Sequence, residues 1–216
     1  MKKFAVVLAG CGRADGAEIN EAVTLLLSIS QQEAAYQCFA PDRMQATTVD
    51  HLTGYAETTP RNILHEAARI ARGNVKPISA FKASDFDALV FAGGAGLAKN
   101  FCNYASQGSN MEVEPDIARV INEMHEAHKP IGGMCIAPVL FANLIKGVYI
   151  TLGNDHTPDA DNARAMGAVH VEAGHGDVVI DEANLVFTTP AFMLDATLAD
   201  VYDGASNLVE AIIDRL

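Results

Sequence analysis

The chain has 216 residues, 50% of them hydrophobic, with a formal net charge of -12 and a pI near 4.9. This length and composition are typical of one domain with a sizeable core, so we expect a single domain over residues 1–216. The acidic balance argues against a nucleic-acid partner, because such proteins bind phosphates with clustered Lys and Arg.

No segment approaches the roughly 18 to 20 consecutive apolar residues that a membrane-spanning helix needs, so we expect no membrane partner. The apolar run after the first lysines is too short for a secretory signal, which predicts a cytoplasmic protein. Cysteines are widely spaced and show no zinc-site pattern, so we expect free thiols and no metal.

Short apolar runs alternate with segments of helical period, a pattern typical of βαβ units. We expect strands over residues 3–9, 36–40, 87–92 and 130–134, and shorter ones over 148–152, 169–171, 178–180 and 185–188. Helices are expected over 18–30, 61–72, 115–128, 137–145 and 195–216. Together they predict an α/β fold, namely a doubly wound, mostly parallel, flavodoxin-like sheet with helices on both faces.

The first helix and three loops bear on function. In the helix over 18–30, we expect the following residues to face the core: Ile19, Ala22, Val23, Leu26 and Leu27. The loops 10–16, 93–96 and 133–138 each follow a strand. Because ligands bind at the carboxyl ends of parallel strands, these loops are expected to converge on a site.

The strongest candidate for chemistry is Cys135, which stands between a predicted strand and a predicted helix. Small residues two positions away, Gly133 and Ala137, permit a sharp turn that presents the thiol. The free N–H groups and the dipole of the following helix are expected to lower the thiol pKa. The alternative is that Cys135 is one more small buried residue.

Backbone N–H groups near Gly94 and Ile136 could form an oxyanion hole, since glycines allow the chain to approach a substrate oxygen. Cys11 lies in the loop 10–16 and either lines the same pocket or packs a turn. Cys38 and Cys102 are interpreted as structural.

A carboxylate could exchange a proton with the thiol, and both Glu18 and Glu21 are placed for this in the first helix. Acidic residues are also common there for dipole reasons alone. A histidine base could come from His156, or from the pair His170 and His175, although lone histidines usually lie on surfaces or in loops.

The sequence resembles the enhancing-lycopene-biosynthesis proteins (ElbB-type, or sigma cross-reacting), in the PfpI-like branch of the class I glutamine amidotransferase-like superfamily. The resemblance covers essentially the whole chain. The motifs that carry it are GCG at 10–12, DG at 15–16, EINEAV at 18–23, CFAPD at 38–42, HLTG at 51–54, GG at 93–94, AKN at 98–100, KPIG at 129–132, MCIAP at 134–138 and TTPA at 188–191.

The resemblance implies roles for particular residues. The elbow cysteine of the superfamily falls on Cys135 and its acidic partner on Glu21, which is therefore preferred to Glu18. Peptidase-like members carry His directly after the Cys, whereas this chain has Ile136. Protease and glutaminase activities are therefore less favoured. His156 is the nearest candidate for the third catalytic residue of other branches.

The resemblance also implies a glutathione-independent, cofactor-free glyoxalase that converts glyoxal to glycolate, with deglycase activity as a variant of the same chemistry. It further implies a homodimer and a link to isoprenoid production. In the hypothesis, Cys135 forms a hemithioacetal, and Glu21, with a raised pKa, moves a proton to give a thioester that water hydrolyses. The alternatives are a thiol-based oxidation sensor or metabolite-binding protein, and a hydrolase or amidotransferase subunit that needs a histidine base.

Overall fold

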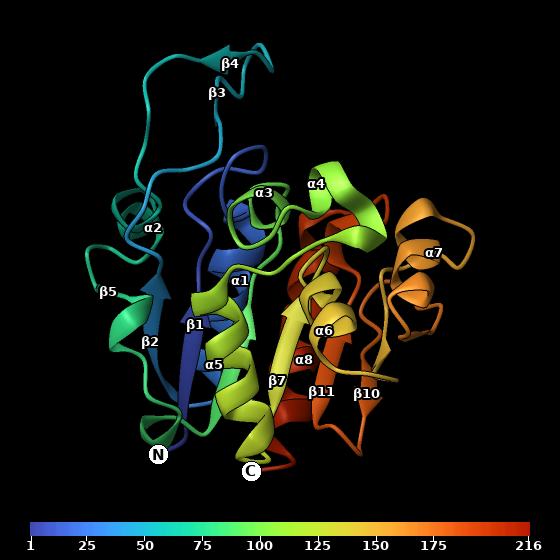
Figure 1. The fold of residues 1–216 in the computed structure, drawn as a ribbon. Coiled ribbons are helices and arrows are strands. Elements are labelled where there is room, and N and C mark those ends of the chain that lie inside the picture. Colours follow the sequence, from blue (N-terminus) through green and yellow to red (C-terminus); the bar gives the residue numbers. More distant parts are fainter.

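The computed structural model describes every residue from 1 to 216 and contains a central sheet of seven strands. Its strand order is β10-β11-β7-β6-β1-β2-β5, and every neighbouring pair is parallel except β10 and β11. The chain builds the sheet in one direction from β1 to β5 and then in the other from β6 to β10. The predicted doubly wound, mostly parallel fold is therefore confirmed (Figure 1).

The strands of the central sheet are β1 (Lys3–Val7), β2 (Ala35–Ala40), β5 (Val75–Pro77), β6 (Ala88–Phe91), β7 (Ile131–Met134), β10 (Val179–Asp181) and β11 (Val186–Thr189). The smaller strands are β3 (Thr48–Val49), β4 (Ala56–Glu57), β8 (Tyr149–Ile150) and β9 (Val169–His170). The helices are α1 (Ile19–Gln31), α2 (Ile63–Ile70), α3 (Leu97–Asn100), α4 (Tyr104–Gln107), α5 (Pro115–Glu126), α6 (Pro138–Leu144), α7 (Pro158–Ala165) and α8 (Leu198–Ile213).

Helices cover both faces of the sheet. α1 and α8 pack together on one face, and α5 and α6 lie on the other (Figure 1). Gly132 in β7 leaves room for α8, because a Cβ there would lie 2.8 Å from Cδ1 of Ile212. The carboxyl ends of the parallel strands meet at one edge, whereas both chain termini lie at the other.

Local sequence signals explain where several helices begin. Pro115 and Pro138 occupy first-turn positions, where the missing N–H is not needed. The Asn62 side chain accepts a hydrogen bond from the backbone N–H of His65, which caps α2. Thr197 and Asp200 form a capping box at the start of α8.

The buried face of α1 differs from the predicted one. Ile19, Val23 and Leu27 are 43%, 48% and 46% exposed, so the expectation that they face the core is wrong. Ala22 and Leu26 are buried as expected, together with Leu25, Ile29, Glu21, Thr24 and Ser28. The helix turns its polar residues inward because Glu21 serves the site described below. An apolar stripe of Ile19, Val23 and Leu27 is left in solvent.

Two small sheets lie outside the central one. β8 and β9 pair with each other, so the predicted strands over 148–152 and 169–171 do not extend the main sheet. β3 and β4 form a hairpin within an arm, residues 44–62, that projects from the body (Figure 1). These strands are two residues long, too short for an alternating pattern to reveal them.

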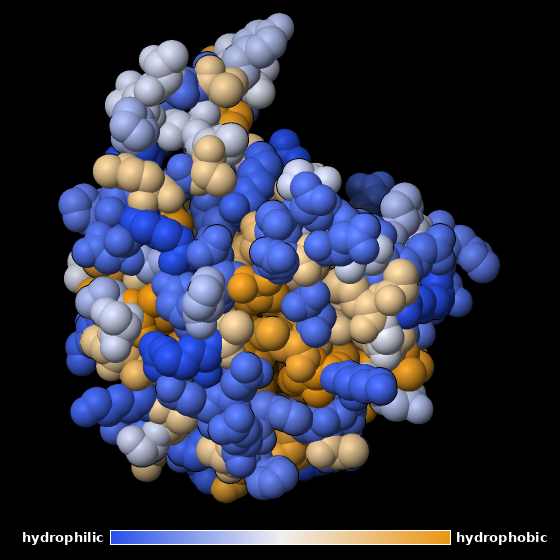
Figure 2. All heavy atoms as spheres, in the orientation of Figure 1, coloured by the Kyte–Doolittle hydropathy of each residue, from blue (hydrophilic) through white to orange (hydrophobic).

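The surface in the orientation of Figure 1 is mostly hydrophilic around its rim, and hydrophobic spheres gather near its middle, where α5 and α6 lie (Figure 2). Every helix is too short or too polar to cross a lipid bilayer.

Candidate active site

The end of β7 leads into a strained turn at Cys135. This residue has φ +59°, in the left-handed region that a non-glycine residue enters at a cost of roughly 1–2 kcal/mol. Its backbone N–H donates to the carbonyl oxygen of Thr189 at 3.0 Å, which ties the turn to the end of β11. The elbow expected at this position is thus present, and it turns the thiol away from the sheet.

Small neighbours make the elbow possible. A Cβ at Gly133 would lie 2.7 Å from Cε2 of Phe141 and 3.3 Å from Cβ of Ala137. Contacts this short would push α6 away from β7. The residues on both sides of Cys135 must therefore be small so that α6 can pack against β7.

Glu21 lies behind the thiol, fully buried in α1. Its Oε2 accepts a hydrogen bond from the backbone N–H of Gly93 at 2.9 Å, and its Oε1 has no hydrogen-bond partner. A Cβ at Gly93 would lie 2.5 Å from Cβ of Cys135 and 2.8 Å from Oε2 of Glu21. The carboxyl group and the thiol therefore flank the same glycine at the end of β6.

The environment of Glu21 favours its neutral form. Burial raises the pKa of this carboxyl group to about 8, and the thiol of Cys135 and the N–H groups of Gly93 and Phe192 oppose the rise. The nearby carboxylate of Glu18 raises it further. The predicted direction is borne out, and Glu21 can exchange a proton near neutral pH.

The thiol pKa moves opposite to expectation. Burial, followed by the nearby Glu21, raises the pKa of Cys135 well above its ordinary value. The N–H groups of Gly94 and Ile136 lower it, but by less. The prediction of a lowered thiol pKa is therefore wrong, because loss of water around the sulfur outweighs the dipoles.

Two backbone donors lie near the sulfur, and they are the N–H groups named as candidates for an oxyanion hole. The N–H groups of Gly94 and Ile136 are directed at Cys135 and have no backbone acceptor. Gly94 has φ +105°, and a Cβ there would lie 2.5 Å from the backbone nitrogen of Glu18. Only glycine allows this loop to pack so closely against the backbone that leads into α1.

A cavity of about 400 Å³ opens beside the thiol. Its lining comes from six parts of the chain: Arg13, Glu18, Gly94, Ala95, Ala98, Tyr104, Ala105, Cys135, Ile136, Asp159, Phe192 and Met193. Glu18, Gly94, Cys135 and Ile136 belong to the predicted site. Arg13 was missed although it stands in the predicted loop 10–16, and no local signal marked the residues from α4, α7 and the segment after β11.

Glu18 has a structural role in addition to lining the cavity. It is the N-cap of α1, and its Oε2 accepts from the backbone N–H of Glu21 at 2.7 Å. The two acidic candidates therefore differ, because Glu18 holds the helix start while Glu21 lies against the thiol.

The structure places Cys11 apart from the cavity. Cys11 is half-buried, and burial raises its pKa with a further rise from Glu66 of α2. It does not line the cavity, so its expected place beside Cys135 is not found. Cys38 and Cys102 are buried, and burial raises the pKa of these thiols to about 12 and about 11, in keeping with structural roles.

The histidine candidates also lie elsewhere. His156 is exposed in the loop before α7 and is absent from the cavity lining. The buried ring of His170 contacts Asp155 and accepts from the backbone N–H of Leu152 at 3.0 Å. His175 lines a separate hollow of about 580 Å³. No histidine lines the Cys135 cavity, so none of the three is placed as a base.

Comparisons with known proteins identify relatives of this chain. No family model matches the chain. A rat protein named ES1 protein homolog, mitochondrial, is 40% identical over 98% of this chain and 83% of its own length. A human protein named glutamine amidotransferase-like class 1 domain-containing protein 3, mitochondrial, is 39% identical over 98% of this chain and 82% of its own length.

Solved structures show the same fold. The crystal structure of an isoprenoid biosynthesis protein with amidotransferase-like domain from Ehrlichia chaffeensis superposes with a TM-score of 0.92 and 37% identity, covering 99% of this chain and 100% of that one. A DJ-1 superfamily protein from Salmonella typhimurium, 20% identical with a TM-score of 0.61, covers 99% of this chain and 91% of its own and shares the fold. The chain belongs to the ES1 and ElbB-type family of glutamine amidotransferase-like class 1 proteins.

Proposed function

We propose that the chain is a glutathione-independent glyoxalase that converts glyoxal to glycolate, and methylglyoxal to lactate, through Cys135. The observation that carries this proposal is the pairing of a cavity thiol with a buried carboxyl group whose pKa is raised to about 8. A group with a pKa near the working pH can both accept and return a proton. The thiol takes the place that glutathione would have.

In the first step, the sulfur of Cys135 bonds to one aldehyde carbon and its proton passes to ionised Glu21. The carbonyl electrons move to the oxygen, which the N–H groups of Gly94 and Ile136 can hold. Glu21 then gives the proton to that oxygen, which leaves a neutral hemithioacetal.

In the second step, Glu21 removes the hydrogen on the hemithioacetal carbon as a proton and returns a proton to the neighbouring carbon. The hydroxyl proton on the first carbon's oxygen passes to the oxygen of the neighbouring carbon. The first carbon is oxidised to a thioester and the second is reduced to an alcohol, so no external oxidant or reductant is needed. Water then cleaves the thioester, which releases the hydroxy acid and restores the thiol.

A thiol-based oxidation sensor or metabolite-binding protein is the alternative to this proposal. Sensor thiols are usually accessible and ionised, and both properties speed their oxidation. Cys135 is 7% exposed and has a raised pKa, which favours the enzyme. A hydrolase or amidotransferase acting through a Cys–His pair is disfavoured too, because no histidine lines the cavity.

Several broader properties are part of the proposal. Deglycase activity would use the same carbonyl addition, and a role near isoprenoid production would agree with the name of the Ehrlichia protein. The exposed stripe of Ile19, Val23 and Leu27 supports a homodimer. All four cysteines are free, which suits a reducing compartment such as the cytoplasm, although the rat and human relatives are named mitochondrial.

The test is steady-state conversion of glyoxal and methylglyoxal without glutathione or added metal, with glycolate and lactate measured as products. We expect turnover in wild type and in His156→Asn, whose ring lies outside the cavity. We expect none in Cys135→Ala or Glu21→Gln. Retained turnover in Cys135→Ala would refute the mechanism. If wild type is inactive but forms one sulfenic acid per chain with peroxide, reversibly, the sensor replaces the enzyme.

A further inference from the structure

The cavity beside Cys135 is large for the smallest dialdehyde. At about 400 Å³ it falls in the range typical of sites for larger ligands, roughly 300–1,000 Å³. Hydrophobic side chains, among them Ala98, Phe192 and Met193, form much of the lining. A substrate that fills this space must extend well beyond its reacting carbonyl.

Arg13 is the only cationic residue that lines the cavity. Its exposed guanidinium has no hydrogen-bond or salt-bridge partner within the protein. By contrast, the two acidic residues of the lining already have donors, since Glu18 accepts from the N–H of Glu21 and Asp159 accepts from the hydroxyl of Tyr104. Among the charged side chains of the lining, the one without a protein partner is therefore a cation with several N–H donors.

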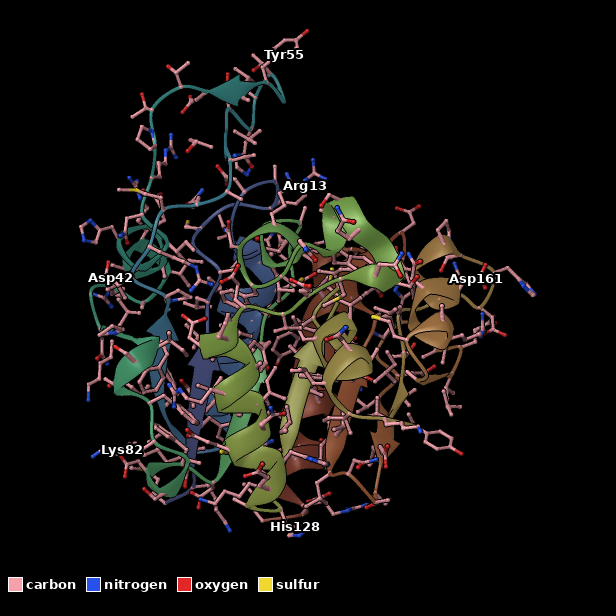
Figure 3. The ribbon with its side chains drawn as sticks, in the orientation of Figure 1. Arg13, Asp42, Tyr55, Lys82, His128 and Asp161 are labelled. Carbon is pink, nitrogen blue, oxygen red and sulfur yellow. The ribbon has the colours of Figure 1, made fainter.

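The backbone beneath Arg13 is held firmly in place. Its carbonyl oxygen accepts from the N–H of Ala95 at 2.7 Å, in the loop that also carries Gly94. The next carbonyl, that of Ala14, accepts from Nζ of Lys99 at 2.8 Å. Figure 3 shows Arg13 at the site edge of the body, between the base of the arm and α4. The backbone of Arg13 is thus tied to the loop that carries Gly94 and to α3, which places its side chain at the cavity.

We infer that the preferred substrate is an α-oxoaldehyde that carries an anionic group, a carboxylate or a phosphate, and that Arg13 binds this group. Arginine matches both anions because its planar fork can donate two parallel hydrogen bonds. The aldehyde reacts at Cys135, the carbon chain lies along the apolar lining, and the anion ends at the cavity rim. This inference rests on the proposed glyoxalase function, and the chemistry of the reacting carbons is unchanged by it.

One experiment tests the role of Arg13 without depending on catalytic turnover. Iodoacetate and iodoacetamide alkylate the same thiol and differ mainly in charge, so the ratio of their rates at Cys135 reports the charge at the cavity. Peptide mass spectrometry would give this ratio for wild type, Arg13→Gln, Arg13→Lys and the control Arg72→Gln, which changes an exposed arginine away from the cavity.

We expect the iodoacetate-to-iodoacetamide ratio to fall about threefold to tenfold in Arg13→Gln, since a positive charge near the thiol attracts the anionic reagent and not the neutral one. The ratio should stay close to the wild-type value in Arg13→Lys and should be unchanged in Arg72→Gln. An unchanged ratio in Arg13→Gln would overturn the role of Arg13. This result does not depend on whether the chain is a glyoxalase.

The second arm measures kcat/KM for methylglyoxal, for an α-oxoaldehyde carboxylate and for a phosphate ester of hydroxypyruvaldehyde. We expect wild type to prefer one of the anionic compounds, which identifies the anion, and Arg13→Gln to lose that preference about tenfold. A preference for methylglyoxal over both would overturn the inference while the glyoxalase stands. Failure with every aldehyde would refute the glyoxalase, and the alkylation ratio would still decide whether Arg13 attracts anions.

Discussion

The carboxyl group of Glu21 and the thiol of Cys135 lie on either side of Gly93, where even a methyl group would collide with both residues. Burial raises the pKa of both groups, and Glu21 raises the pKa of Cys135 further, so at neutral pH the pair mostly keeps both protons. Attack by the sulfur therefore requires Glu21 to be ionised and ready to accept the thiol proton. The arrangement makes Glu21 a base rather than a group that merely stabilises a thiolate.

This relationship predicts that Glu21→Gln separates thiol reactivity from turnover. A neutral amide removes the negative charge that Glu21 carries above its pKa of about 8, so alkylation of Cys135 by iodoacetamide at pH 9 should become faster, by about threefold or more. Wild-type alkylation should be slow at pH 7 and rise steeply above pH 8. Aldehyde turnover should nevertheless be lost. Slower alkylation in Glu21→Gln than in wild type would contradict this account.

The raised pKa of Glu21 also makes a prediction for stability. Between the ordinary pKa of 4.5 and the folded value of about 8, the folded chain holds a proton that the unfolded chain releases. The contribution of Glu21 to the free energy of unfolding is fully present below about pH 4.5, and it is lost as the pH rises through about 8. Glu21→Gln cannot ionise, so it should gain stability relative to wild type on going from pH 5 to pH 9.

The relative gain should be on the order of a few kcal/mol, at about 1.4 kcal/mol per pKa unit. Urea unfolding of both proteins at the two pH values measures it. The control is Glu18→Gln, which removes a carboxylate whose oxygen caps a helix. An equal stability difference between wild type and Glu21→Gln at pH 5 and pH 9 would show that Glu21 titrates normally.

Gly93→Ala should destroy the site. The added methyl would lie 2.5 Å from Cβ of Cys135, and backbone must move to relieve that contact. We expect a loss of turnover of at least about a hundredfold and a thermal midpoint several degrees lower, as for other overpacked cores. Gly174→Ala is the matched control, because its Cβ would meet only one side-chain oxygen at 3.3 Å. Normal activity in Gly93→Ala would contradict the packing described for the site.

The stripe on α1 should mediate self-association. Ile19, Val23 and Leu27 follow one another at the spacing of helical turns and remain in solvent in the single chain. If two copies bury this stripe, Val23→Glu should convert the dimer to a monomer in light-scattering measurements. Val169→Glu, which changes an exposed apolar residue on β9, should leave the mass unchanged. A wild-type monomer, or a dimer unaffected by Val23→Glu, would exclude this interface.

Some features of the fold and the site could be predicted because their signals are local in the chain. The strand, the small residues and the following proline lie together around Cys135, and buried parallel strands appear as continuous apolar runs. Arg13, Tyr104 and Asp159 carry no such signal, since only the folded chain brings their loops and helices to one cavity.

Two predictions failed because they depended on burial. The helix dipole near Cys135 could be inferred from sequence, but the loss of water around the sulfur could not, and the latter decides the thiol pKa. The face of α1 was misjudged for a related reason. The helix turns Glu21 inward to meet the thiol, so large apolar residues that normally mark a core face are left outside.

The hydrogen bond from Cys135 to Thr189 has a consequence for the order in which the molecule acquires its reactivity. The nucleophile and its acid are both synthesised well before β11, yet the backbone that holds the elbow is contributed by that late strand. A nascent chain that has not reached Thr189 lacks this tether. The catalytic arrangement around the thiol is therefore completed only when the last part of the chain folds.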